Sequence, residues 1–446
     1  VRRGTGLRDA ATSFGQVAIV AVVLLAASVV ANAYTQMTSP TELVTTDYGR
    51  LVLVKVVLLV GLVMLAGRVR RVLVPRLSGP GGAAAFVKVV MLEVVLMALA
   101  VGVGVALART PSPRVATEFP TYAETLLGFP FPPEPTVAGV MLGWRPDALM
   151  LSACLIAAAM YVAGVLRLRS RGDAWPVGRT ISWLLGVGFV LWATNAGIAA
   201  YSQVAFSLHM LQHMALSMMA PILLVLGAPT TLALRAIKPA PHGRRGPREW
   251  LVWFLHSPYA KFITHPIFVL IIYTVGLYGL YYTTFFGTLM GAHAGHVFMQ
   301  VHFIVAGYLF YWVVIGIDPT PRQVPYWGRM LLLLLSLVIH SFFALPIMMS
   351  GTAMAQDWYG LVQPPWLTDQ LADTRLAGGI AWGFGEIPTL IVIIALSVQW
   401  ARSDAREAKR HDRKADRDGD SELHAYNDRL ARMNARAEKG EVTRSE

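Results

Sequence analysis

Ten runs of mostly apolar residues, each about 20 residues long, fill most of the first 400 positions of this chain. A run of that length crosses the hydrocarbon core of a bilayer as one helix. The strands of a membrane barrel would show alternating polarity, and these runs do not. The sequence therefore predicts an all-α integral membrane protein with about ten transmembrane helices. The runs lie near residues 15–33, 51–67, 88–108, 148–166, 180–199, 208–227, 266–284, 294–316, 329–350 and 378–399.

Positive charge predicts the direction of these spans. With a cytoplasmic N-terminus, the inner segments before the tail hold 20 Lys and Arg residues and the outer loops hold five. Cytoplasmic loops carry such an excess, so both termini are predicted to be cytoplasmic. Topology thus explains the net charge of +12, since the sequence shows no soluble domain with a basic face for nucleic acid. We expect a multi-pass protein of the cell membrane, in contact with lipid and not with nucleic acid.

Two segments divide the chain into parts. The predicted outer loop 109–147 contains eight prolines, which prevent a continuous helix and favour extended chain. It separates a three-span part, residues 1–108, from a seven-span part, residues 148–400. The tail, residues 401–446, carries 12 basic and 11 acidic residues of alternating sign. This pattern predicts a solvated helix or a disordered cytoplasmic extension.

All eleven histidines lie beyond residue 208, and six of them lie in or beside predicted spans. His209 and His213 are four residues apart and share one helix face. His293 and His296 are three residues apart at the start of a later span. The predicted topology places both pairs at the outer ends of their helices. Neutral imidazole binds copper, zinc, iron or haem iron, so the pattern predicts a metal site that opens outwards.

Other side chains extend the candidate site. His302 lies deeper and can face elsewhere, and His340 lies near mid-membrane. Glu386 lies within the last span, where a charge costs at least ~2.5 kcal/mol and is usually functional. Met210 and Met214 follow the first two histidines, and thioether sulfur suits Cu(I). Without a metal, such histidines would hydrogen-bond between helices and such methionines would fill apolar space. The candidate metal ligands are His209, His213, His293, His296, His302, His340, Glu386, Met210 and Met214.

Several short motifs lie along residues 129–399. They are Trp144-Arg145-Pro146-Asp147, His209-Met210-Leu211-Gln212-His213, Pro221 followed by Leu226-Gly227-Ala228-Pro229, Gly307-Tyr308-Leu309-Phe310, Gly316-Ile317-Asp318-Pro319, His340-Ser341-Phe342-Phe343, and Trp382-Gly383-Phe384-Gly385-Glu386-Ile387-Pro388. In these motifs the chain resembles the CtaG-type assembly factors of caa-type cytochrome c oxidase, which are seven-span membrane proteins.

The first part carries Tyr48-Gly49-Arg50, Lys55, Arg70-Arg71 and Glu93. On these residues it resembles the last spans of CopD-type copper-resistance membrane proteins, and the fused order looks like that of actinobacterial proteins. The two resemblances imply a protein that helps to mature the copper centres of a haem-copper oxidase, by delivering copper or by holding the apo-subunit. They imply copper as the metal and oxidase subunits as partners during assembly. The outer copper centre of an oxidase is assembled on the side to which the predicted site opens.

Four functions remain open from the sequence. The first is a copper-binding assembly factor that is not an enzyme. The second is a membrane metalloenzyme such as a di-iron hydroxylase, although the adjacent histidine pairs of such sites do not occur here. The third is a haem-binding or quinone-reactive redox protein. The fourth is a copper transporter with Lys55, Glu93 and Glu386 as transport charges, although no clear internal repeat supports it. The single cysteine, Cys154, excludes an internal disulfide and a CxxC copper-chaperone motif.

Overall fold

The structure is a computed structural model, which describes residues 29–30, 33–34, 36–37, 39–68, 82–113, 121–241 and 246–442. Within these ranges every regular element is a helix, and β-structure is limited to one isolated bridge between Trp144 and Ala196. The prediction of an all-α protein is therefore confirmed.

Nine of the ten predicted spans coincide with helices, and the run at residues 15–33 lies mostly outside the described residues. Seven helices of the described part are long and apolar enough to cross a membrane, which confirms the multi-pass prediction. Two further apolar helices, Met91–Leu107 and Pro266–Tyr281, are shorter, so the total of ten spans stays a prediction. The spanning elements are α3 (Asp47–Arg68), α5 (Gly82–Arg109), α9 (Ala148–Arg169), α10 (Val177–Asn195), α12 (Phe206–Met214) continued by the π-helix η2 (Ala215–Met219) and α13 (Ala220–Leu226), α17 (Pro266–Tyr281), α19 (His293–Ile315), α20 (Tyr326–Met348) and α22 (Gln370–Asp418).

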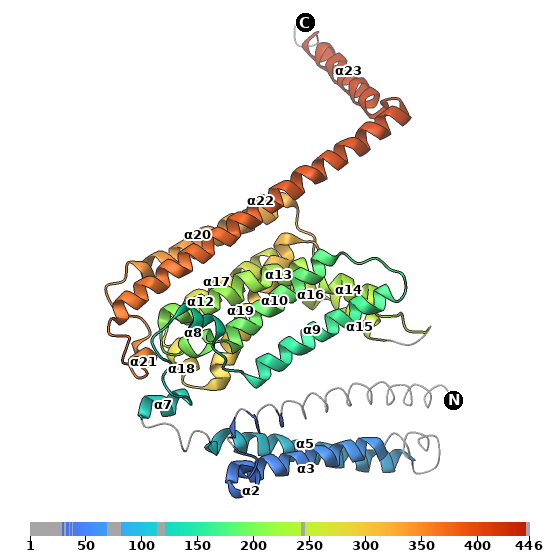
Figure 1. Ribbon diagram of the computed structural model, residues 1–446. Helices are drawn as coiled ribbons and strands as arrows, with labels where there is room; N and C mark the ends of the chain where they lie inside the picture. The colour runs from blue at the N-terminus through green and yellow to red at the C-terminus, as the bar shows by residue number, and fades with distance from the viewer. Residues whose placement is uncertain are drawn as a thin grey trace.

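Two helices form the centre of the bundle that follows residue 147. In an apolar 18-residue stretch of each long span, 61% of the residues are buried in the span that contains α12 and α13, and 61% are buried in α19. The buried share in the other long spans is 22% to 39%. Around this pair pack α10, α17, α20 and α22, with α9 outside α10 (Figure 1). The first part of the chain contributes the antiparallel pair α3 and α5. Residues on α12 and α19 are thus the most shielded from lipid and water.

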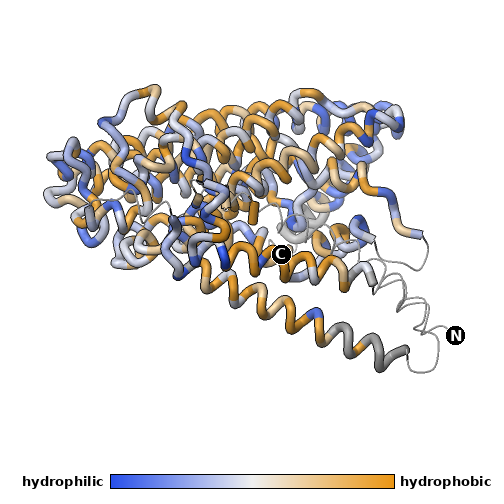
Figure 2. The backbone as a smooth tube through the Cα atoms, turned by 60° about the horizontal axis from the view of Figure 1, so that its bottom comes forward, coloured by the Kyte–Doolittle hydropathy of each residue, from blue (hydrophilic) through white to orange (hydrophobic). Residues whose placement is uncertain are grey.

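Polar residues gather at the two ends of the bundle, and apolar residues cover its middle (Figure 2). One end, at the left of Figure 1, carries the short helices α8, α18 and α21, and the other carries α14, α15 and α16. Among the described residues from 145 to 400, ten Lys and Arg belong to the α14 end and only Arg145 and Arg375 to the α8 end. The charge rule therefore predicts that the α8 end is the outer one, and the outer end below means the α8 end. The short helices are α2 (Glu42–Thr45), α7 (Tyr122–Leu127), α8 (Val137–Leu142), α11 (Ile198–Tyr201), α14 (Pro229–Ala236), α15 (Pro247–His256), α16 (Pro258–Ile263), α18 (Phe285–Met290) and α21 (Gln356–Tyr359).

A buried aspartate from the last span caps the central helix. Asp373, in the first turn of α22, accepts hydrogen bonds at the start of α12 from the backbone N–H of Phe206 (2.7 Å) and from both the backbone N–H and the hydroxyl of Ser207. Helix N-termini leave backbone donors unsatisfied, and a carboxylate there also complements the helix dipole. This contact joins residues 166 positions apart and fixes the place where α12 begins.

A second buried aspartate acts in the same way at the opposite end. Asp318 accepts from the backbone N–H groups of Thr230 (2.7 Å) and Thr231 (2.8 Å) and from the Thr231 hydroxyl. These donors begin α14, which follows Ala228 in a left-handed conformation (φ 49°). The start of α12 and the start of α14 are therefore each held by a carboxylate from a later part of the chain.

The loop is more helical than expected, and the tail is helical, which is one of the two predicted alternatives. In the predicted loop 109–147, α7 and α8 flank the proline-rich residues 129–135, and Thr121 and Thr136 cap them. In the tail, α22 continues as one helix to Asp418, and α23 (Ser421–Val442) follows it away from the bundle (Figure 1). The described side chains of this extension are almost all exposed, as the solvated-helix alternative requires.

Candidate metal centre

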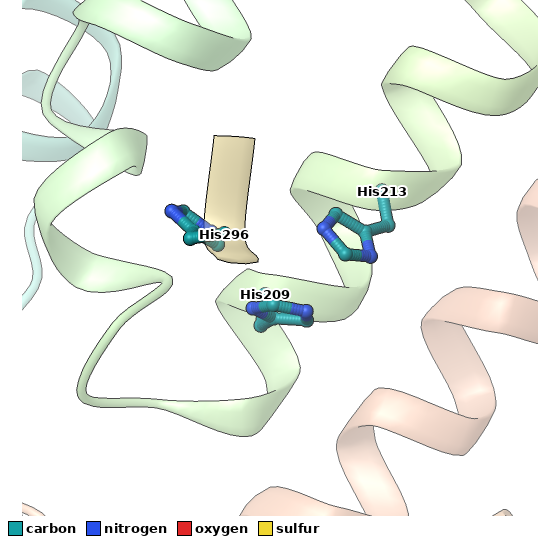
Figure 3. A group of neighbouring side chains, drawn as sticks. All are labelled: His209, His213 and His296. Atoms are coloured by element: carbon teal, nitrogen blue, oxygen red, sulfur yellow. The ribbon is translucent and has the colours of Figure 1, made fainter. Parts of the chain in front are cut away.

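Three histidines from the two central helices meet near the outer end of the bundle. His209 and His213 lie one turn apart on α12, and His296 lies in the first turn of α19. One ring nitrogen of each lies within 4.8 Å of those of the other two. Figure 3 shows the three rings around one small space, two from one helix and one from the other. The structure thus forms a triad, defined here as His209, His213 and His296.

The triad is buried and its nitrogens lack protein partners. His209 and His213 are fully buried, and His296 is 6% exposed. Neither nitrogen of His209 has a partner at hydrogen-bonding geometry, and the same holds for Nε2 of His213 and Nε2 of His296. Burying a polar group without a partner costs roughly 1–3 kcal/mol, so nearly all such groups in proteins are satisfied. Each ring therefore has a nitrogen that could bind an ion, and one ion bound by all three rings would satisfy one nitrogen of each.

Aromatic side chains surround the triad and one of them orients it. The Tyr281 hydroxyl, at the end of α17, is hydrogen-bonded to Nδ1 of His213 at 2.8 Å. This bond occupies Nδ1 and leaves Nε2 of His213 without a protein partner. When the Tyr281 oxygen accepts from Nδ1–H, Nε2 carries the lone pair that a metal ion needs. The ring centres of Phe286 and Phe303 lie 4.9 Å from that of His209 and 4.5 Å from that of His213, respectively. Hydrogen bonds from an outer residue to a metal-binding imidazole fix its tautomer and its orientation.

Removing the Tyr281 hydroxyl should weaken metal binding without abolishing it. In Tyr281→Phe the ring remains, but Nδ1 of His213 loses its partner, and we expect the dissociation constant for Cu(I) to rise about 10- to 100-fold. Tyr282→Phe is the matched control, because the neighbouring hydroxyl donates to the Phe343 carbonyl instead. A competition titration with a Cu(I) chelator measures both variants. Equal affinities in the two variants would show that Tyr281 does not orient the triad.

The donor set fits a transition-metal ion. The triad supplies neutral nitrogens, and the described part of the chain adds no carboxylate or thiolate to it. Neutral imidazole binds copper, zinc, iron and nickel ions. Nitrogens that share one ion lie about 3.5 Å apart when each is about 2 Å from it, so small ring rotations would close the triad. Met210 and Met214, the predicted sulfur ligands, are fully buried in the same core, and their role stays a prediction.

His293 lies apart from the triad. Its Nε2 lies 3.0 Å from Asp147 Oδ2, and its side chain is 75% exposed. Asp147 also caps α9 by accepting from the backbone N–H of Leu149 and Met150. Burial raises the pKa of Asp147, but the bonds from His293 and these backbone donors outweigh it, so the pKa lies below its usual value. Asp147 is therefore a charged partner for His293 at neutral pH.

The other predicted ligands also lie outside the triad. His340 bonds through Nε2 to the Ala381 carbonyl (3.0 Å), and a Cβ at Gly385 would overlap its ring, so it ties α20 to α22. A Cβ at Gly276 of α17 would likewise overlap the ring of His302, so this ring packs directly against the α17 backbone. Glu386 is half-buried on α22 and does not belong to the group of clustered ligands. Their role as metal ligands stays a prediction.

The site is closed rather than open. The sequence predicted a helix mouth open to the outside, but the triad is buried beneath aromatic residues of the short helices at this end, among them Phe286 of α18 and Tyr359 of α21. Tyr359 is fixed by its hydroxyl, which donates to the Ser202 carbonyl. Connections between spans can fold over a helix end, and the sequence pattern of the spans alone does not reveal this.

Sequence reasoning also missed two supporting residues. Asp373 holds the start of α12, and Tyr281 orients His213. Asp373 had a usable signal, since it is an ionisable residue only a few positions before the last predicted span. Tyr281 had none, because a tyrosine near a span end is typical of the membrane interface.

The comparisons with known proteins show the family of the chain. The model of the cytochrome c oxidase caa3 assembly factor family (CtaG) matches residues 159–403, more than half of the chain and the whole triad. The chain belongs to this family. The model of copper resistance protein D (CopD) matches residues 8–107. The CtaG–CopD fusion predicted from the sequence motifs is thus confirmed, whereas the domain boundary at 109–147 stays a prediction.

Curated relatives of this CtaG-type chain come from mycobacteria. An uncharacterized protein of Mycobacterium bovis is 45% identical over 324 residues, which is 72% of this chain and 49% of that protein. An uncharacterized protein of Mycobacterium leprae is 42% identical over 330 residues, 74% of this chain and 50% of that protein. The chain therefore spans about half the length of these relatives. No solved structure matches it.

Proposed function

We propose that this chain binds a copper ion at His209, His213 and His296 and supplies it during the assembly of cytochrome c oxidase. One observation carries the proposal. Three imidazoles from two helices place their ligand atoms within 4.8 Å, and four of their buried nitrogens have no protein partner. Membership of an oxidase assembly factor family and the CopD match support a copper-associated assembly role.

Copper is the cargo in this proposal, not the cofactor of an enzyme. The triad would hold the ion by neutral nitrogens, with the Tyr281 hydroxyl keeping His213 in the binding tautomer. The surrounding aromatic rings exclude water, which protects Cu(I) from oxidation and from competing ligands. In the predicted topology the triad faces the outer side of the membrane, so the oxidase partner would receive copper there.

A deletion strain tests the assembly role. We expect the oxidase subunits to remain in the membrane while the copper content per oxidase falls, since copper supply and not synthesis is lost. Expression of the wild-type chain should restore the copper, and expression of the His209→Ala/His213→Ala variant should not. Copper would be measured by mass spectrometry on the purified oxidase. Normal oxidase copper in the deletion strain would refute the proposal.

The metal found in the purified chain separates the other functions. Copper without a Soret band supports the proposal. Iron, or a Soret band in the absorption spectrum of the same sample, would instead indicate the metalloenzyme or haem protein considered from the sequence. Copper in the chain together with an unaffected oxidase and altered cellular copper would indicate a transporter.

A further inference from the structure

His293 forms a polar contact on the outer surface next to the triad. It begins α19, and its exposed ring is held by Asp147 Oδ2 at 3.0 Å. Asp147 is itself fixed, since its backbone N–H donates to Asn195 Oδ1 (2.8 Å) and its Oδ1 accepts from the start of α9. The carboxylate is therefore positioned by two other helices, and it in turn sets the direction of the imidazole.

The contact determines which nitrogen of His293 is free. A carboxylate accepts hydrogen bonds, so in the neutral form of His293 the proton is on Nε2 and the lone pair is on Nδ1. The ring is 75% exposed, so Nδ1 is available to a ligand from solution. A carboxylate that holds one nitrogen of an imidazole while the other binds a metal is a common arrangement at metal sites.

The triad member nearest to His293 along α19 is His296. It follows His293 by three residues, which places their Cβ atoms about 5–6 Å apart, although the His293 ring bonds to Asp147 and the His296 ring belongs to the triad. His296 is also the triad member with residual exposure, at 6%, while His209 and His213 have none. An ion that reached the triad along α19 would therefore pass from His293 to His296.

We propose that His293, oriented by Asp147, is the exchange ligand through which Cu(I) enters and leaves the triad. The inference rests on the proposed copper-binding function. The step is a ligand exchange in which the ion leaves Nδ1 of His293 for a nitrogen of His296, without change of oxidation state or net proton transfer. The partial positive charge at the N-terminus of α19 disfavours a resident cation at His293, so the ion is not trapped there.

Rates of copper transfer in the purified chain in detergent test the proposal. Apo-protein is mixed with the Cu(I)–bicinchoninate complex under anaerobic, reducing conditions, and loss of the complex's absorbance gives the loading rate. Unloading is followed with excess chelator. The variants are His293→Ala and Asp147→Asn, with His256→Ala as control, an exposed histidine on α15 at the opposite end.

Asp147→Asn is the decisive variant. Asparagine keeps the cap of α9, because its oxygen still accepts from Leu149 and Met150. Its NH₂ group then faces Nε2 of His293, which must become the acceptor, so the proton moves to Nδ1 and the free lone pair is lost. We expect both His293→Ala and Asp147→Asn to slow loading and unloading by the same factor, about tenfold or more, with affinity and copper per chain unchanged. A residue on the transfer path changes both rates equally, whereas structural damage changes affinity.

Each other outcome overturns the inference in a distinct way. Wild-type rates in both variants would mean that the contact only clamps α9 to α19. Loss of copper per chain in His293→Ala would make His293 a resident ligand. Absence of copper from the wild-type chain would refute the proposed function itself. Failure of the His293 inference alone would leave copper in the wild-type chain, so the two failures are distinguishable.

Discussion

Replacing His209 and His213 together by alanine should lower the copper content of the purified chain from about one ion to background. The variant removes two of the three clustered ligands, and the single imidazole of His296 that remains cannot hold an ion against a chelator. Copper per chain would be measured by mass spectrometry after detergent purification. The control is His256→Ala/His411→Ala, which removes two exposed histidines outside the site. Retained copper in the triad variant would refute the assignment of these residues.

A variant on α19 distinguishes loss of the metal site from misfolding of α12. His296→Gln keeps a polar side chain on α19 and leaves α12 unchanged, and it should also lower copper content. Size-exclusion profiles and thermal unfolding should match those of the wild type. If His296→Gln binds copper normally while the α12 variant does not, the site lies on α12 alone and the triad is not the binding unit.

Asp373→Ala should destabilise the protein by about 3 kcal/mol and should also weaken copper binding. The substitution leaves the buried N–H groups of Phe206 and Ser207 without an acceptor, and hydrogen bonds to charged groups contribute about 1.5–3 kcal/mol each to stability. It also removes the cap of α12, where caps contribute about 1 kcal/mol. The start of α12 should fray, and His209, one turn later, should lose its position. The melting temperature in detergent and the copper affinity are the two measurements.

Asp369→Ala is the matched control for this variant. Asp369 caps α22 itself by accepting from the backbone N–H of Ala372, and it is exposed. Its loss should cost about 1 kcal/mol and leave copper binding unchanged. Asp373→Asn, which keeps one oxygen acceptor, should lie between the two. Equal melting temperatures for Asp373→Ala and Asp369→Ala would show that the contact with α12 adds no stability.

Sequence periodicity predicted part of the site and missed part of it. His209 and His213 were correctly placed on one face because the α-helix repeats every 3.6 residues wherever it packs. The same reasoning paired His293 with His296, yet in the structure His293 bonds to Asp147 on the surface while His296 faces inwards. Spacing gives the angle between two side chains on a helix, but not which of them faces a neighbouring helix.

The sequence by itself determined the helical membrane architecture, because long apolar runs have few other solutions in a bilayer and because basic residues collect on one side of them. It also supplied the family and most of the ligand candidates. Only the tertiary structure decided which candidates meet and that the site is closed. The rotation and depth of α12 and α19 depend on contacts between residues far apart in the chain, such as Asp373 with Phe206 and Tyr281 with His213. Such contacts leave no local pattern, since they result from how complete helices pack against one another.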